Sequence, residues 1–481
     1  MTLILTSSEP VPTGQMAPIA LLPNEILIAI FKHGLNELPE SARSPSFRKI
    51  TASVCKAWHD VVLRSPELWT RVFVTLTTPV EHLQTCIERS GSLQLDLDIC
   101  HFVFDPLNCP SCPERFLIAV LDLIRCHSHR LRSLTLWNIP DVAVDMIWKR
   151  FRNIRGPVLT DISVKNRPHS HVRLPTVPLF PFLDGHTPKL TNMEIDFPFM
   201  IHNVDVKLFN LPVLTYLTLR TRECPLIGYS LPPYLIEFST FCALLRTTPN
   251  LAHLALYGPV IEPDEDFPNR PPPVTLPALK TLIIHRREPG VRYHAEFLSV
   301  LTAPHLAHLE LPWHDELRVE LPRQDCTGYL FGAEGAPRFP LVRRLCLHDS
   351  AVEWKLPAVS FIRAFPLVED VMLGGTDVET FAATLRRSAV VVAKPKFVDY
   401  GAGPVAWPCV RKLTLRSVHM HSWKRCAAFL CEWLAARGCC DKGCVRVEVE
   451  RCSVPPARLR AFMKCLDRLR PYAQVAYRDV F

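Results

Sequence analysis

Cysteine and histidine residues gather in two parts of the sequence, and their side chains are common metal ligands. Thiolates and imidazoles suit tetrahedral Zn²⁺, and a Cys-x-x-Cys pair has the spacing of a zinc knuckle. The first group is Cys100, His101, Cys109, Cys112, Cys126 and His127, and the second is Cys439, Cys440 and Cys444. Neither group has a matching second pair at standard spacing. We therefore predict no bound metal and no cofactor, and a metal-stabilised module stays open as an alternative that metal analysis would test.

The sequence also lacks the common catalytic motifs. It contains no Gly-x-Ser-x-Gly elbow, no Walker phosphate loop and no His-Glu-x-x-His pair. The net charge of +8, from 55 basic and 47 acidic residues, is mild for 481 residues. The most basic stretch, residues 458–470, is better explained as a solvated helix face than as a nucleic-acid stripe. We predict that the chain is not an enzyme and binds no nucleic acid.

The N-terminus and the cysteine content bear on location. The first residues, MTLILTSSEP, lack the basic region and apolar core of a signal peptide. No apolar run reaches the roughly 18 residues that span a bilayer. The 18 cysteines are then expected to be reduced. We predict a cytoplasmic or nuclear protein with no membrane partner, and a disordered segment at residues 1–18.

Ten segments share one pattern, in which apolar residues stand at the first, fourth and sixth positions. The segments begin at Leu131, Leu159, Leu190, Leu214, Leu251, Leu279, Leu306, Val342, Val368 and Val410. Nine of them have a proline two positions earlier, at Pro157, Pro188, Pro212, Pro249, Pro277, Pro304, Pro340, Pro366 and Pro408. Proline ends a helix and cannot donate to a strand ladder, so it belongs just before a strand begins.

Helical stretches alternate with these strands. They are FSTFCALLRT, AEFLSVLT, VSFIRAF, VETFAATLRR and WKRCAAFLCEWLAARG. Upstream, VFVTL and SLQLDLDIC are predicted strands, a helix is predicted around Val120, and VRVEVER is a possible eleventh strand of the pattern. One strand–helix unit cannot bury its apolar side alone, so the units must stack. We predict an α/β fold with a curved parallel sheet; an ordinary α/β domain with right-handed crossovers is the alternative.

The Leu-x-x-Leu-x-Leu segments of residues 131–450 resemble a leucine-rich-repeat domain. The match is degenerate, because the Asn expected three residues after the third apolar position is missing, as at Ile139 and Arg222. The resemblance implies a leucine-rich-repeat solenoid over residues 76–481 with a C-terminal helix.

Period two along each strand assigns the side chains of the concave face. One row consists of Trp137, Lys165, Asp196, Arg220, Tyr257, His285, Pro312, His348, Gly374 and Arg416. The row two positions earlier consists of Thr135, Ser163, Glu194, Thr218, Ala255, Ile283, Glu310, Cys346, Met372 and Thr414. Tyr, Trp and Arg are typical interface anchors. We predict that Trp137, Arg220, Tyr257, His285, His348 and Arg416 bind a protein partner, with a solvated sheet face as the alternative.

Residues 22–73 precede these strands and have the pattern of short helices. Pro23 and Glu25 suit the first turn of a helix. Ile26, Leu27, Ile30 and Phe31 are expected to share one face, and Gly34 is expected to end the helix. A second helix is predicted through Ile50, Val54, Trp58 and Val61 or Val62, and Ser65 is expected to cap a third start at Pro66. So small a module must complete its core on a partner or on the following domain.

Leu22-Pro23, Glu25-Ile26-Leu27, Ile30-Phe31, Val54-Cys55, Trp58 and Pro66-Glu67-Leu68-Trp69 together resemble an F-box, over residues 19–75. A Pro- and Ser-rich insert, NELPESARSPSFRK, is longer than in the short form of the motif and looks like that of fungal F-box-like proteins. The family implies docking onto the Skp-type adaptor of a Skp–cullin–F-box ubiquitin ligase. The implied adaptor-binding residues are Leu22, Pro23, Glu25, Ile26, Leu27, Ile30, Phe31, Val54 and Trp58.

The two resemblances together imply a substrate-recognition subunit. The F-box would bind the adaptor, and the repeats would present a target protein to a cullin ligase. The alternative is an F-box-like scaffold for protein–protein interaction outside ubiquitin ligation. The target protein, and any modification that it needs, stay open.

Overall fold

The structure is a computed structural model. It describes residues 22–37, 46–75, 78–100, 112–139, 143, 146–147, 150, 155–165, 187–196, 211–221, 235–258, 260–262, 272–285, 293–312, 329–332, 335–348, 363–374, 382, 407–417, 423–437, 445–452, 454 and 456–478. The predicted disordered segment 1–18 and the cysteines at 109, 439, 440 and 444 lie outside these residues. Among the helices described, none is both long enough and apolar enough to cross a bilayer.

The N-terminal helical module, residues 22–69, begins with α1 (Asn24–Glu37). The carbonyl of Pro23 accepts the first helical hydrogen bonds, from the backbone N–H groups of Ile26 and Leu27, each at 3.1 Å. The prediction that Gly34 ends this helix is wrong, because the helix continues through it. A Cβ at Gly34 would lie 2.6 Å from the ring of Phe47, so this glycine lets the next helix approach.

The second predicted helix is in fact two helices, α2 (Ser46–Val54) and α3 (Lys56–Arg64). Cys55 separates them in an extended conformation, and its sulfur accepts a hydrogen bond from the backbone N–H of Trp58 at 3.5 Å. A 3₁₀ turn, η3 (Pro66–Trp69), follows with Pro66 in its first turn, as expected. The Ser65 hydroxyl does not cap this turn; it donates instead to the Val61 carbonyl at 2.6 Å.

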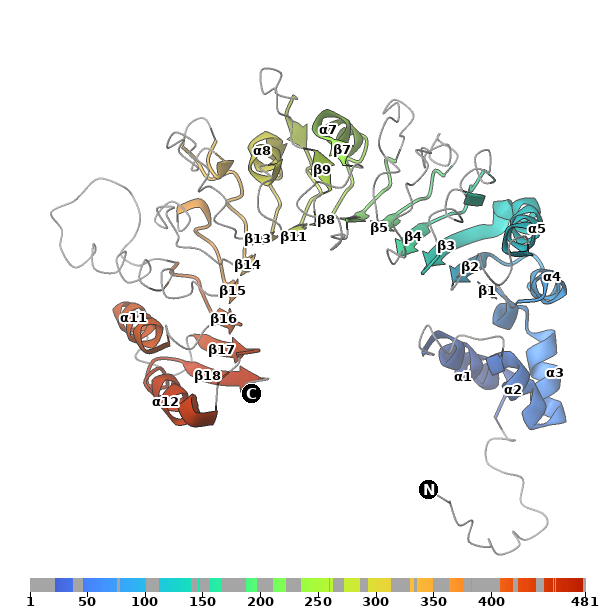
Figure 1. Cartoon of the computed structure of the whole chain (residues 1–481), viewed down its shortest axis with the longest axis horizontal. Coiled ribbons are helices and arrows are strands. Elements are labelled where there is room, and N and C mark those ends of the chain that lie inside the picture. Colours follow the sequence, from blue (N-terminus) through green and yellow to red (C-terminus); the bar gives the residue numbers. More distant parts are fainter. Residues whose placement is uncertain are drawn as a thin grey trace, which may run out of the picture.

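Fourteen of the described strands form one sheet, in which neighbouring strands are parallel and follow chain order. They are β1 (Arg71–Val74), β2 (Leu95–Cys100), β3 (Leu131–Trp137), β4 (Asp161–Lys165), β5 (Asn192–Asp196), β6 (Tyr216–Arg220), β8 (His253–Tyr257), β11 (Thr281–His285), β13 (His308–Pro312), β14 (Arg344–His348), β15 (Asp370–Gly374), β16 (Lys412–Arg416), β17 (Arg446–Glu450) and β18 (Gln474–Arg478). Figure 1 shows that the sheet lines the inner side of an open arch. The curved parallel sheet and its ten patterned strands, nine of them led by a proline, are thus as predicted.

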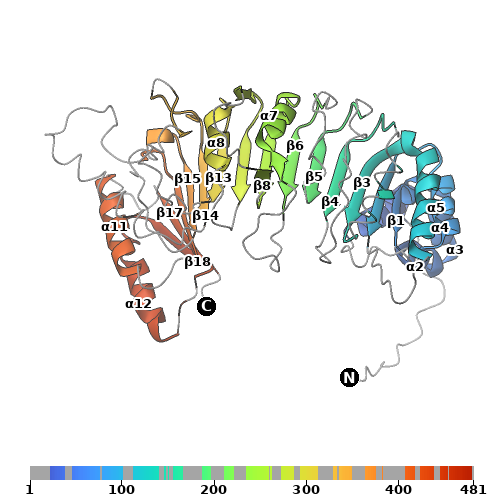
Figure 2. The ribbon, with the colours of Figure 1, turned by 45° about the horizontal axis from the view of Figure 1, so that its top comes forward.

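The outer side of the arch carries helices and short strand pairs (Figures 1 and 2). They are α4 (Val80–Arg89), α5 (Cys112–Cys126), the 3₁₀ turn η4 (Ser128–Arg130), α7 (Phe238–Arg246), α8 (Tyr293–Val300), α11 (Trp423–Ala436), α12 (Pro456–Asp467), the pair β7 (Ile236–Glu237) and β9 (Ile261–Glu262), and the pair β10 (Val274–Thr275) and β12 (Leu301–Thr302). These include four predicted helices: the one around Val120 and those of FSTFCALLRT, AEFLSVLT and the Trp423 segment. Most of VSFIRAF and VETFAATLRR lies outside the described residues.

The repeated prolines lie before the strands, as expected, and each occupies a tight turn. In the turn before β4, the N–H of Leu159 donates to the Gly156 carbonyl at 3.1 Å, so Pro157 is the second of four turn residues. Proline favours that position because its fixed φ matches the turn. The same bond joins Leu279 to Leu276, around Pro277. Each turn ends on an apolar residue that is fully buried under the sheet, such as Leu159 or Leu279.

The residue after a strand often extends the ladder by one hydrogen bond in a left-handed conformation. Asn138 and Gly258 both have positive φ, and their N–H groups donate to the carbonyls of Lys165 and His285 on the next strand. A Cβ at Gly258 would lie 2.1 Å from the Thr221 carbonyl oxygen, so only glycine fits there. These bonds give the backbone N–H groups just after β3 and β8 their acceptors.

One continuous apolar core runs from the helical module to the last strand and includes Leu27, Phe31 and Ala473. The module therefore completes its core on the sheet, as its size predicted. β1 already belongs to the sheet although it precedes residue 76. The possible eleventh strand is β17, and β18, after the C-terminal helix, was not predicted.

Candidate functional site

The helical module presents an apolar surface that nothing in the described chain covers. Ile26 and Ile30 of α1 are 47% and 45% exposed, and Ile50 and Val54 of α2 are 62% and 58% exposed. The free energy falls when side chains of this kind are transferred out of water. We call these four residues the outer apolar surface.

The four residues lie on helix faces that meet. Gly34 of α1 lies against the ring of Phe47 of α2. The two isoleucines of α1 stand one and two turns before Gly34, and Ile50 and Val54 stand about one and two turns after Phe47. Both pairs therefore extend from one point of contact.

Other predicted adaptor-binding residues face inward. Leu27 and Phe31 are buried, and the ring of Phe31 meets Trp58 edge-to-face with centroids 4.8 Å apart. Leu22 and Trp58 are half-buried against the same core. The expectation of one shared apolar face on α1 is therefore wrong, because Ile26 and Ile30 point outward while their neighbours pack on the core. Pro23, Glu25 and Val54 are exposed.

Arg48 joins the helical module to the start of the sheet. The residue is 6% exposed, and its guanidinium donates to the carbonyl of Leu68 at 2.6 Å and to that of Arg71. It also lies over the Trp69 ring, 5.3 Å from the centroid. Burial lowers the pKa of Arg48. The contacts of one side chain thus fix the module against β1.

The concave face brings the predicted rows into register. Trp137 pairs with Lys165, Arg220 with Tyr257, and Tyr257 with His285 across adjacent strands. The row two positions earlier is partly covered, since Thr218, Ala255 and Cys346 are buried. Side chains on the inside of a curved sheet converge, so the larger residues of neighbouring rows cover the smaller ones.

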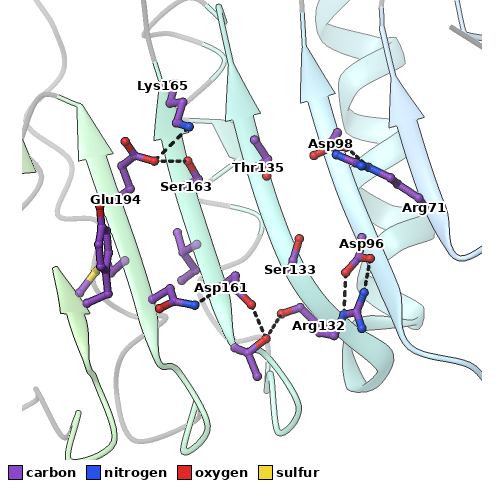
Figure 3. Close-up of a pocket in the computed structure, with 15 residues that line it drawn as sticks. Arg71, Asp96, Asp98, Arg132, Ser133, Thr135, Asp161, Ser163, Lys165 and Glu194 are labelled. Carbon is purple, nitrogen blue, oxygen red and sulfur yellow. Dashed lines mark hydrogen bonds and ion pairs between the residues drawn. The ribbon is translucent and has the colours of Figure 1, made fainter. Parts of the chain in front are cut away.

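A polar groove of about 830 Å³ opens at the N-terminal end of this face (Figure 3). It is lined by Arg71, Asp96, Asp98, Arg132, Ser133, Thr135, Thr160, Asp161, Ile162, Ser163, Lys165, Asn192, Met193, Glu194 and Tyr216. Arg71 donates to Asp98 at 2.9 Å, and Arg132 donates to both carboxylate oxygens of Asp96. The groove is therefore charged, but its ions are paired with each other.

Glu194 connects side chains of the groove with a side chain from the middle of the sheet. One carboxylate oxygen lies 3.1 Å from Lys165 Nζ and 3.3 Å from Ser163 Oγ, and the other lies 2.9 Å from Arg220 Nη2. Arg220 in turn lies over the Tyr257 ring at 4.8 Å. Charge pairing thus holds predicted partner-binding side chains in one geometry.

The middle of the face carries stacked aromatic and imidazole rings. Tyr216 stacks on His253 with centroids 4.3 Å apart, and Tyr257 stacks on His285 at 5.4 Å. Burial is the main cause that lowers the pKa of His253 and raises that of Tyr257. Both groups therefore favour their neutral forms, which suits stacking.

Four side chains with metal-ligand atoms adjoin the stacked rings. His285 Nε2 donates to Glu310 Oε1, and Glu310 Oε2 lies 3.6 Å from His308 Nε2. His308 Nε2 lies 3.7 Å from Cys346 Sγ. Burial raises the pKa of the Cys346 thiol to about 11 and lowers the pKa of His308. We call His285, His308, Glu310 and Cys346 the His–Glu–Cys cluster.

The remaining predicted partner-binding residues lie away from the ring stack. Trp137 is half-exposed on β3, and Arg416 is half-exposed at the end of β16, paired in register with Gly374. His348 ends β14 opposite Pro312, and its side chain lies outside the described set. The structure thus joins Arg220, Tyr257 and His285 in one surface.

The groove carboxylates of β2, Asp96 and Asp98, were not predicted as site residues. Asp96 and Asp98 alternate in the β2 sequence LDLDIC, so they share one face. The same parity rule that assigned the rows of later strands would have found them. β2 lacks the full Leu-x-x-Leu-x-Leu pattern from which the rows of the later strands are assigned.

Comparison with known proteins identifies one part of the chain. A search of curated proteins finds no match. Residues 19–75 match the family model described as F-box-like, which covers α1, α2, α3, η3 and β1. The chain therefore contains an F-box-like domain, a protein-interaction module, at residues 19–75.

Proposed function

We propose that this chain is the substrate-recognition subunit of a Skp–cullin–F-box ubiquitin ligase. The F-box-like domain binds a Skp-type adaptor, and the concave face of the sheet holds a target protein. The chain itself performs no bond chemistry; it raises the effective concentration of the target near the ubiquitin-transfer subunits.

The outer apolar surface carries this proposal. Ile26, Ile30, Ile50 and Val54 are large apolar side chains exposed on two adjoining helices of a domain whose family binds such adaptors. Leu27 and Phe31, buried behind them, position α1 rather than contact the adaptor. A partner that covers the four exposed residues would bury apolar area that the folded chain leaves in water.

The test is capture of a purified Skp-type adaptor by the full chain. Ile30→Asp combined with Ile50→Asp places two charges in the contact and is expected to weaken binding by about 100-fold or more, as for the loss of a central anchor. The matched control is Leu459→Asp on α12, where the leucine is 41% exposed at the far end of the arch.

Two outcomes decide the proposal. Equal capture of the adaptor by the double variant and by Leu459→Asp would show that the outer apolar surface does not bind the adaptor. Absence of adaptor binding by the wild-type chain would favour the scaffold alternative.

For the rest of the chain, we propose a degenerate leucine-rich-repeat solenoid over residues 76–481. Strands that follow chain order support it, and so does the proline turn that precedes eight of them, β4, β5, β6, β8, β11, β13, β14 and β16. The partner surface would centre on Arg220, Tyr257 and His285, whose side chains are pre-ordered by stacking and charge pairing. Trp137, His348 and Arg416 would extend it along the arch.

A further inference from the structure

We propose that the His–Glu–Cys cluster on the concave face binds a Zn²⁺ ion. His308, Glu310 and Cys346 supply the ligand atoms, and His285 orients the carboxylate from behind. This goes beyond adaptor and target binding, and against the expectation from sequence that the chain holds no metal. It also lies far along the chain from the cysteine clusters that suggested zinc at first.

The ligand geometry supports the proposal. In a tetrahedral zinc site with bonds of ~2.0–2.3 Å, ligand atoms lie about 3.3–3.7 Å from one another. His308 Nε2 lies 3.6 Å from Glu310 Oε2 and 3.7 Å from Cys346 Sγ, and all three ligand atoms lie within 4.8 Å of one another. The two distances from His308 match edges of such a tetrahedron, and the third lies within reach of a small side-chain adjustment.

The sheet holds the three ligands in place. His308 and Glu310 are two residues apart on β13, so they share the concave face, and Glu310 pairs in register with Cys346 on β14. Strands give more exact positions than loops, and a metal site depends on such positions. The site is therefore largely formed before the ion arrives.

The donor set favours zinc over hard cations. A thiolate, an imidazole and a carboxylate together suit Zn²⁺, whereas Mg²⁺ and Ca²⁺ take oxygen ligands. Zinc binding would form a Zn–S bond as the Cys346 thiol releases its proton to solvent. His308 and Glu310 side chains are 23% and 15% exposed, so solvent reaches the fourth coordination position from the concave side.

Two neighbouring side chains affect zinc binding in opposite directions: His285 favours it, and Arg344 opposes it. His285 Nε2 donates to Glu310 Oε1, which leaves Oε2 directed toward His308. Such a partner orients a ligating carboxylate. The Arg344 guanidinium interacts with Cys346 and opposes a cation, but it is 55% exposed and lies 3.7 Å from Asp370, so it can turn toward that carboxylate.

The experiment measures zinc bound to the full purified chain after removal of free metal, and the spectrum after addition of Co²⁺ alone. The wild-type chain is expected to bind Zn²⁺ and to show a thiolate-to-cobalt charge-transfer band. Cys346→Ser and His308→Gln should each lose that ion and that band, whereas Cys465→Ser on α12 should lose neither. His285→Ala should weaken zinc binding about tenfold, as for loss of an orienting partner.

The readout is the difference from wild type, because other cysteines of the chain can hold metal of their own. Glu310→Gln keeps the side-chain shape and replaces a ligand, so it decides the matter if Cys346→Ser does not fold. Thermal unfolding of each metal-free variant checks folding. Zinc content and cobalt spectra equal to wild type in both His308→Gln and Glu310→Gln would overturn the proposal.

Discussion

The exposed side chains of the F-box-like domain and those of the concave sheet face differ in how they are held in place. In the domain, four large apolar side chains stand in water and contact no described neighbour that covers them. On the sheet face, rings stack and charges pair across strands, as in the Lys165–Glu194–Arg220 network. A partner that covers the apolar side chains of the domain would therefore lower the free energy. A ligand of the sheet must instead fit side chains whose positions are already fixed.

The sharpest test of this contrast is inside the domain, between two neighbouring residues of α1. Phe31→Ala should lower the free energy of unfolding by about 3–5 kcal/mol, because the ring is buried against Trp58. Ile30→Ala should change it by less than ~0.5 kcal/mol, because the side chain is exposed. Denaturant unfolding measures both. Similar losses in the two variants would show that Ile30 is buried in the free chain.

The joint between the two regions should show the next largest effect. Arg48→Met keeps the length of the side chain but removes its hydrogen bonds to the buried carbonyl of Leu68 and the partly buried carbonyl of Arg71. We expect a loss of about 2–3 kcal/mol, since each unsatisfied buried acceptor costs roughly 1–3 kcal/mol.

Arg89→Met is the matched control for that prediction. Arg89 also lies over the Trp69 ring, at 4.6 Å, but is exposed. If both variants lose the same stability, the contact with the ring rather than the carbonyl bonds holds the joint. Hydrogen exchange of η3 and β1 would locate the loss.

A smaller loss of stability than at the joint is expected on the sheet face. Glu194→Gln removes the charge that holds Lys165 and Arg220, and both partners are more than a third exposed. Solvent screening limits the expected loss to about 0.5–1 kcal/mol. The difference from wild type should shrink in high salt, as measured by thermal unfolding at two ionic strengths. A loss of stability that does not change with salt would mean that the packing of the Glu194 side chain, rather than its charge, accounts for the contribution of this network to stability.

Periodic patterns made most of the fold predictable. Buried Leu134 and Leu136 of β3, and their equivalents in nine other segments, point inward because alternate residues of a strand face the same side. The nine prolines marked the entries to strands, and the structure adds that each lies in a tight turn. β18 was not predicted; the side chains of QVAYR are only partly buried or exposed, and pairing with β17 places this segment in the sheet.

Local breaks in the helical module were less predictable. Gly34 is of the residue type that often ends a helix. Here the ring of Phe47 packs in the space that a side chain at this position would fill. Cys55 has no helix-breaking type, yet it divides α2 from α3. In both cases a long-range contact or a single backbone conformation overrides the local preference of the residue.

By itself, the sequence determined the alternation of strand and outer segment, the parity of each strand and the apolar character of the first helices, because these depend on local spacing. Tertiary structure alone decided which apolar residues of α1 face outward. It also decided how strands β11, β13 and β14 bring His285, His308, Glu310 and Cys346 together. Those residues span more than sixty positions of the chain, so only the stacking of successive strands sets the distances between their side chains.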